Sequence, residues 1–127
     1  MVPYIATTSE ITVTVRPVYL DSESDIINRR FVFGYFIQID NDSPSEVQLL
    51  RRHWFIRDEG GRVQEVEGEG VIGVQPLIPA GGRHKYSSFC VLDTFVGSMQ
   101  GTYLMERENG ERFRIVIPRF HLRAASN

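Results

Sequence analysis

The chain has 127 residues, of which 42% are hydrophobic and 24% charged, and its formal net charge is −2 at pH 7. A chain of this length and composition is typical of one globular domain that buries a substantial core. The small net charge gives no general attraction to nucleic acid or to an anionic membrane surface, so no nucleic acid partner is expected.

The cysteine content and the first residues of the chain indicate the cellular compartment in which the protein is expected. Cys90 is the only cysteine, which excludes an internal disulfide and suits a reducing environment. The residues that follow Met1 do not resemble a signal peptide, and no apolar run approaches the length of about 20 residues that spans a bilayer. We therefore expect a cytoplasmic protein without a membrane span.

Strand patterns dominate the chain between its two ends. Residues 1–10 carry little pattern and are predicted to form a loose N-terminal arm, and residues 123–127 a frayed tail. Pro17 is predicted to end the first strand or to place it at a sheet edge. The predicted strands span residues 11–16, 31–39, 47–57, 63–67, 86–92, 102–107 and 113–117.

These strands predict the fold class. No segment has sustained helical periodicity, and turn residues such as Asn109-Gly110 separate the strands. We expect an all-β, antiparallel two-sheet β-sandwich of the fibronectin type III or immunoglobulin kind, with about seven strands in one domain over residues 1–127. Trp54 occupies the third strand, where such sandwiches bury a tryptophan, and Tyr103 lies where a tyrosine corner is expected.

The alternation within strands also predicts faces. Phe33, Trp54 and Ile115 are expected in the shared core. Leu50, Arg52 and Ile56 fall on the same face of the third strand as Trp54. A charged guanidinium cannot be buried without a partner, so Arg52 is predicted to bond to acceptors in the loop 68–76 and to hold that loop in shape.

A glycine-rich motif follows the fourth predicted strand. Gly68, Gly70 and Gly73 spell G-x-G-x-x-G, which binds phosphate when a strand precedes it and a helix follows. Pro76 and Pro79 exclude a helix there, so we expect the glycines to serve turn geometry. Phosphate binding stays open as the alternative. The candidate counter-charges around this loop are Arg52, Arg83, His84 and Lys85.

The sequence offers few candidates for catalysis or metal binding. His53, His84 and His121 lie on three different segments without ligand spacing, so we expect no metal centre. Cys90 lies in an alternating strand, where a free cysteine usually acts as a small core residue. Neither a Gly-x-Ser-x-Gly nucleophile elbow nor a Ser-x-x-Lys motif occurs, and we expect no cofactor and no enzymatic activity.

A row of glutamates marks one predicted edge strand. Glu65, Glu67 and Glu69 alternate and therefore share one face. Such a row could bind a cation, but a charged edge that discourages aggregation is the interpretation we favour.

Several longer motifs together resemble the ApaG family. They are Leu50-Arg51-Arg52-His53-Trp54, the stretch from Gly68 to Pro76, Tyr86-Ser87-Ser88, and the stretch from Gly97 to Tyr103. The resemblance covers nearly the whole chain and implies a fibronectin type III-like sandwich. It also implies a link to cobalt and magnesium resistance or efflux, a protein-interaction role seen where the domain occurs in larger proteins, and pyrophosphate or nucleotide binding at Gly68, Gly70 and Gly73.

The sequence thus favours a non-enzymatic binding module with a protein partner. A homodimer formed through an edge strand, either the strand that Pro17 ends or the strand 63–67, is also considered. The alternative function is a small-ligand sensor that binds a pyrophosphate, a nucleotide or a divalent cation near the Gly68–Gly73 loop.

Overall fold

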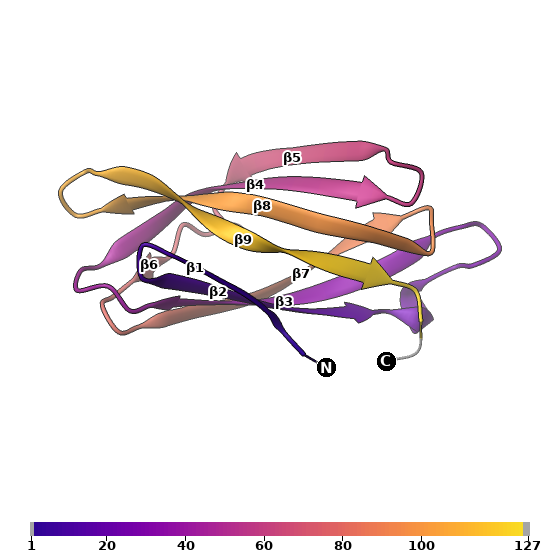
Figure 1. Cartoon of the computed structure of the whole chain (residues 1–127), viewed down its shortest axis with the longest axis horizontal. Coiled ribbons are helices and arrows are strands. Elements are labelled where there is room, and N and C mark those ends of the chain that lie inside the picture. Colours follow the sequence, from indigo (N-terminus) through magenta and orange to yellow (C-terminus); the bar gives the residue numbers. More distant parts are fainter. Residues whose placement is uncertain (1, 126–127) are drawn as a thin grey trace.

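Two antiparallel sheets lie face to face in the computed structural model, which describes residues 2–125 (Figure 1). The first sheet has the order β1-β2-β3-β7, and the second β5-β4-β8-β9, with β6 also pairing with β4. The strands are β1 (Tyr4–Thr8), β2 (Ile11–Tyr19), β3 (Phe31–Asn41), β4 (Val47–Asp58), β5 (Val63–Glu69), β6 (Leu77–Ile78), β7 (Arg83–Leu92), β8 (Val96–Arg107) and β9 (Arg112–Arg123). A short 3₁₀ helix, η1, spans Asp21–Glu23.

The all-β sandwich predicted from the sequence is confirmed, with two more strands than expected within the described part of the chain. One of them, β1, replaces the predicted loose arm, which was wrong for residues 4–8. Ser9 and Glu10 both have positive φ and reverse the chain, so that β1 pairs along β2 from Tyr4 with Val15 to Thr8 with Ile11. The other, β6, is a two-residue strand beyond the glycine motif.

The C-terminal end is also more ordered than predicted. Arg123 is the last residue of β9, and the amide of Ala124 donates a hydrogen bond to the carbonyl of Phe95 at 2.7 Å. The remainder of the predicted tail, residues 126–127, lies outside the described residues. Among residues 2–125, no helix is long and apolar enough to cross a membrane.

The predicted core is confirmed at its central residues. Phe33, Trp54 and Ile115 are all buried between the sheets. The Trp54 ring meets Tyr103 and Phe120 edge-on, with centroids 6.4 and 5.9 Å away. Such edge-to-face aromatic contacts add to the free energy of burial. Tyr35 of β3 packs against Trp54 and Phe120 with ring centroids 5.5 and 5.8 Å away, so the aromatic cluster joins the two sheets.

A β-bulge in β4 changes one predicted face. The register between β4 and β8 shifts between Leu49 and Arg51, so Leu49 faces the core and Leu50 does not. The prediction for Leu50 was therefore wrong. Beyond the bulge the alternation resumes, and Arg52, Trp54 and Ile56 share the inner face as predicted.

The predicted tyrosine corner takes another form. Tyr103 lies in the middle of β8 and is fully buried, but its hydroxyl bonds to the hydroxyl of Tyr86 on the opposite sheet. A tyrosine corner would bond to a backbone group near its own strand. Tyr103 therefore ties the two sheets together through side chains.

One side of the sandwich is closed and the other is open. On the closed side β1 and β2 pack against β9, and the amide of Val116 donates to Thr8 Oγ1 at 3.1 Å. The open side lies between β7 and β5, the last strands at that side of their sheets (Figure 1). β2 is an interior strand from Ile11 to Val15, where it pairs with β1, so this stretch is not a dimerising edge. The strand continues through Pro17 to Tyr19, so Pro17 does not end it, but Pro17 lies past the pairing with β1, as expected for a proline at a sheet edge.

Candidate functional site

The glycine motif forms an excursion from the edge of β4. The amide of Gly70 donates to the carbonyl of Leu50 at 2.8 Å, and the amide of Leu49 donates to the carbonyl of Pro76 at 3.0 Å. Between these two bonds Val71 and Val74 exchange both backbone hydrogen bonds around a two-residue turn. β5 therefore leaves β4 at Gly70, turns back on itself and rejoins β4 as β6.

Each glycine of the motif has a structural role in this excursion. A Cβ on Gly70 would lie 2.2 Å from the carbonyl oxygen of Val74, and the φ of Gly70 is +62°. Gly73 has a φ of +76° in the turn that it forms with Ile72, which is the geometry of a primed hairpin turn. Turn geometry thus explains the motif, and β6 follows it instead of a helix.

Arg52 connects this loop to β4 as the sequence predicted. Its Nη1 donates hydrogen bonds to the carbonyl oxygens of Glu69 at 2.9 Å and Gly70 at 3.1 Å. The guanidinium lies against Gly68, where a Cβ would come within 3.0 Å of both terminal nitrogens. Gly68 therefore leaves room for the cation, and the loop binds it through backbone carbonyls.

Arg52 also reaches a cleft of about 390 Å³ at the open side, which we call the inner cleft. Residues on its wall include Tyr35, Arg52, Trp54, Ile72, Tyr86 and Cys90. Burial raises the pKa of Tyr86 and of Tyr103 well above the usual range, although Arg52 acts in the opposite direction on both. The tyrosine hydroxyls are therefore protonated at neutral pH and serve as hydrogen-bonding groups.

Cys90 has the properties of a core thiol. It is buried in β7, and burial raises its pKa from an ordinary 9.0 to about 12. Because the thiolate is the nucleophile, a thiol with so high a pKa is inert at physiological pH.

The raised pKa values of the buried Cys90 thiol and tyrosine hydroxyls predict how the stability of the protein depends on alkaline pH. Between pH 9 and 12 an unfolded chain loses the Cys90 proton that the folded protein keeps, so stability falls as the pH rises. Each pH unit should lower the free energy of unfolding by about 1.4 kcal/mol per such group. Urea unfolding at a series of pH values would measure this. In Cys90→Ala the decline should begin about one unit later, near the ordinary pKa of 10.0 of Tyr86; identical profiles would contradict the role of Cys90.

The structure separates the other predicted counter-charges from Arg52. Arg83 and Lys85 lie on the outer face of β7, and Arg83 pairs with Asp40 at 2.8 Å. His84 lies on the inner face, where burial lowers its pKa and its Nε2 has no hydrogen-bond partner among the described residues. The four residues proposed as counter-charges, Arg52, Arg83, His84 and Lys85, therefore do not converge on the Gly68–Gly73 loop.

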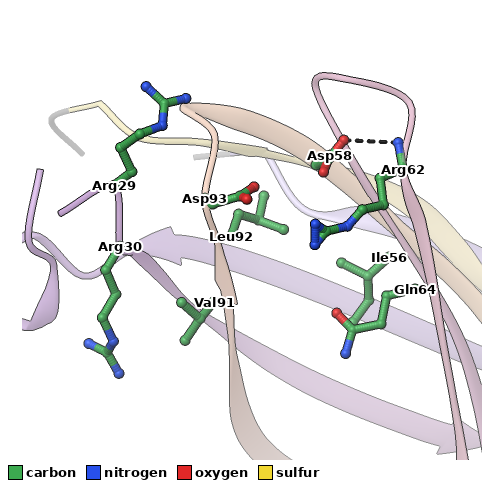
Figure 2. Close-up of a pocket in the computed structure, with 9 residues that line it drawn as sticks. All are labelled: Arg29, Arg30, Ile56, Asp58, Arg62, Gln64, Val91, Leu92 and Asp93. Atoms are coloured by element: carbon green, nitrogen blue, oxygen red, sulfur yellow. Dashed lines mark hydrogen bonds between the residues drawn. The ribbon is translucent and has the colours of Figure 1, made fainter.

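A second cavity, of about 300 Å³, lies at one end of the sandwich (Figure 2). Arg29, Arg30 and Arg62 line it together with Asp58 and Asp93. Figure 2 shows that Arg62 extends toward the middle of the cavity, whereas Arg29 and Arg30 point away from it in different directions. Two carboxylates and diverging arginines do not make a cradle for an anion.

A cluster that the sequence analysis missed lies on the outer face of β4 and β5. His53, Glu65 and Glu67 bring one donor atom each within 4.8 Å of one another. The pairing register places Glu67 opposite His53 and Glu65 opposite Phe55. The sequence did show the glutamate row and His53, but only the strand pairing brings them together.

Exposed apolar side chains gather on the outer face of the first sheet, and we call Phe36, Phe89 and Val91 the β7 patch. Phe89 is 64% exposed and Phe36 is 56% exposed. Phe36 lies opposite Ser87 and Phe89 opposite Gly34, so the two rings belong to adjacent, diagonal positions of β3 and β7. A hollow of about 400 Å³ beside Phe36 is also lined by Arg16 and Lys85.

These features define an immunoglobulin-like β-sandwich with one closed and one open side, an inner cleft and an exposed edge strand. A family model described as the ApaG domain matches residues 21–107. The chain belongs to the ApaG family.

Relatives and solved structures agree with this assignment. Protein ApaG of Sinorhizobium fredii is 51% identical over 119 residues, which cover 94% of this chain and 92% of the relative. Protein ApaG of Paramagnetospirillum magneticum is 50% identical over the same shares of the two chains. A crystal structure of an ApaA protein from Bordetella pertussis is 42% identical, has a TM-score of 0.87, and covers 89% of this chain and 92% of its own.

Proposed function

We propose that the protein is a non-enzymatic binding module that binds a partner protein along β7. The observation that carries this proposal is the β7 patch beside an edge strand that takes no further strand within residues 2–125. Clustered apolar side chains on a soluble surface mark interaction sites. An exposed strand edge offers backbone hydrogen bonds to an extended segment of another protein.

The contrast between the two edges of the open side supports β7 as the binding edge. β5 carries Glu65 and Glu67, and such charges discourage strand addition. β7 carries no charged residue from Tyr86 to Leu92, and its outward positions include Phe89 and Val91. An incoming strand would therefore pair with β7 at lower cost than with β5.

The charges beside the β7 patch suggest the chemistry of the partner. Arg16 and Lys85 line the same hollow as Phe36, and both are cations. Charge complementarity favours an acidic residue on the partner at this point, next to apolar residues that cover the patch. We propose an extended segment that combines apolar and acidic side chains.

Replacing Phe89 with lysine should weaken partner binding by about tenfold or more, because a central aromatic residue often contributes about 2 kcal/mol to an interface. The matched control is Val116→Lys, which places the same charge at a half-exposed apolar position on the other sheet. Tagged wild-type protein and both variants would be used for affinity enrichment with quantitative mass spectrometry, followed by calorimetry with the purified partner. Equal enrichment by all three proteins would contradict the proposal.

The same variants test self-association. If a second copy of the chain occupies the β7 patch, light scattering would show a dimer for the wild type and for Val116→Lys and a monomer for Phe89→Lys. We propose that the interaction takes place in the cytoplasm, the compartment that a lone reduced cysteine suits. The part in cobalt and magnesium resistance that the family resemblance implies would then be exerted through the partner.

A small anion such as pyrophosphate or a nucleotide is the second candidate ligand, and the inner cleft favours it. Arg52 reaches this cleft beside Ile72 and Gly73 of the loop. An anion there would have to draw the guanidinium away from the carbonyls of Glu69 and Gly70. A thermal-shift panel of polyphosphates and nucleotides tests this candidate, since a ligand that binds the folded protein raises its melting temperature.

A further inference from the structure

We propose that His53, Glu65 and Glu67 form a binding site for a divalent transition-metal ion, with Zn²⁺ as the representative ion. The three side chains supply one imidazole nitrogen and two carboxylate oxygens, all within 4.8 Å of one another. Three protein ligands with a fourth, open position are the donor set of an accessible zinc site. This site is separate from the β7 patch.

The distances fit the coordination geometry of such an ion. Nε2 of His53 and Oε2 of Glu65 are 2.5 Å apart, so a lone pair from each converges on the proton that they share. Donor atoms around a tetrahedral zinc lie roughly 3.3–3.5 Å apart, given bonds of about 2.0–2.2 Å. Small rotations of the His53 and Glu65 side chains would lengthen the distance between Nε2 and Oε2, and a rotation of Glu67 would bring its carboxylate to the same point. The metal ion would then occupy the position of the shared proton.

The sheet holds the ligands in position. His53 and Glu67 are directly paired across β4 and β5, and Glu65 is the next residue on the same face of β5. The His53 ring packs against Phe55 with centroids 4.7 Å apart. Ligands on paired strands are held more rigidly than ligands on loops, so little ordering is needed when the ion binds.

The ligand types determine which ion the site prefers, and the exposure of the two glutamates leaves the fourth coordination position of the ion open to water. The side chains of Glu65 and Glu67 are 56% and 44% exposed, whereas that of His53 is 22% exposed. An imidazole ligand suits zinc and its neighbours, whereas Mg²⁺ and Ca²⁺ prefer sites made wholly of oxygen. Nε of Arg51 lies 3.8 Å from a carboxylate oxygen of Glu67, but this ion pair is exposed and screened by solvent. It is therefore weak enough for a divalent cation to replace Arg51 as the partner of Glu67.

The experiment is a Zn²⁺ titration of the whole chain, by calorimetry and by competition with a chromophoric chelator. We expect one ion per chain for the wild type. His53→Gln and Glu65→Gln should each weaken binding at least about tenfold, because even residues that only orient metal ligands contribute about 10- to 100-fold to affinity. Both substitutions keep a polar side chain of similar size on the outer face of the sheet, where His53 is partly exposed and Glu65 is exposed, so the fold should persist.

Matched controls distinguish this site from general surface binding. His121→Gln removes an exposed histidine outside the site, and Glu69→Gln removes the next glutamate of the same row. Both variants should bind Zn²⁺ like the wild type, and millimolar Mg²⁺ should not displace it. Saturating Zn²⁺ should raise the melting temperature of the wild type and leave that of His53→Gln unchanged. Equal Zn²⁺ affinity in His53→Gln, Glu65→Gln and the wild type would overturn the proposal.

Discussion

Replacing Gly101 with alanine is expected to destabilise the protein by about 3 kcal/mol or more, the upper part of the range for overpacking a well-packed interior. Gly101 lies in β8 between Trp54 of β4 and Ile117 of β9. A Cβ there would lie 2.0 Å from the carbonyl oxygen of His53. That oxygen belongs to a paired backbone and cannot move without separating β4 from β8 at the centre of the second sheet.

Chemical denaturation of the purified variant would measure this effect as a lower urea midpoint. The matched control is Gly60→Ala in the turn between β4 and β5, where the nearest atom to an added Cβ is 3.4 Å away and φ is not in the left-handed region. The control should unfold within about 0.5 kcal/mol of the wild type, as surface substitutions usually do. Similar midpoints for Gly101→Ala and Gly60→Ala would show that β4 and β8 can separate locally at little cost.

Replacing Arg52 with lysine is expected to cost about 1–3 kcal/mol, because hydrogen bonds from a charged group contribute about 1.5–3 kcal/mol and two such bonds lose their geometry. The guanidinium crosses Gly68 and donates to the carbonyls of Glu69 and Gly70. Lysine keeps the positive charge, but it lacks the planar fork that meets these acceptors. The loop would lose its connection to β4 while the net charge of the protein stays the same.

The neighbouring residue provides the control for this second substitution. Arg51 lies on the outer face of β4 and only approaches Glu67, at 3.8 Å, with both side chains largely in solvent. Arg51→Lys should therefore change stability little, because exposed ion pairs contribute less than about 1 kcal/mol. Hydrogen exchange at residues 70–76 should accelerate in Arg52→Lys alone. A wild-type melting curve together with unchanged exchange would refute the anchoring role of Arg52.

The sequence by itself determined the fold class and much of the core. Period-two alternation identified every strand longer than five residues, and it placed Phe33, Trp54 and Ile115 between the sheets. The charge of Arg52 on an apolar face predicted acceptors in the glycine-rich loop, and the structure confirms that bond. These inferences succeed because side-chain alternation and the cost of burying a charge are local properties of the chain.

Only the tertiary structure decided that β1, β7 and β9 became edge strands, where β4 bulges and which side chains meet across strands. β1 lacks a clear pattern because it is a short edge strand, and its pairing with β2 stabilises it. His53 lies 12 residues from Glu65, and the register of β4 with β5 places their side chains in contact. Leu49 took the core position predicted for Leu50 because the bulge shifts the pairing with β8 by one residue. Register and edge position depend on the energy of whole paired strands and sheets, which no single segment of the sequence encodes.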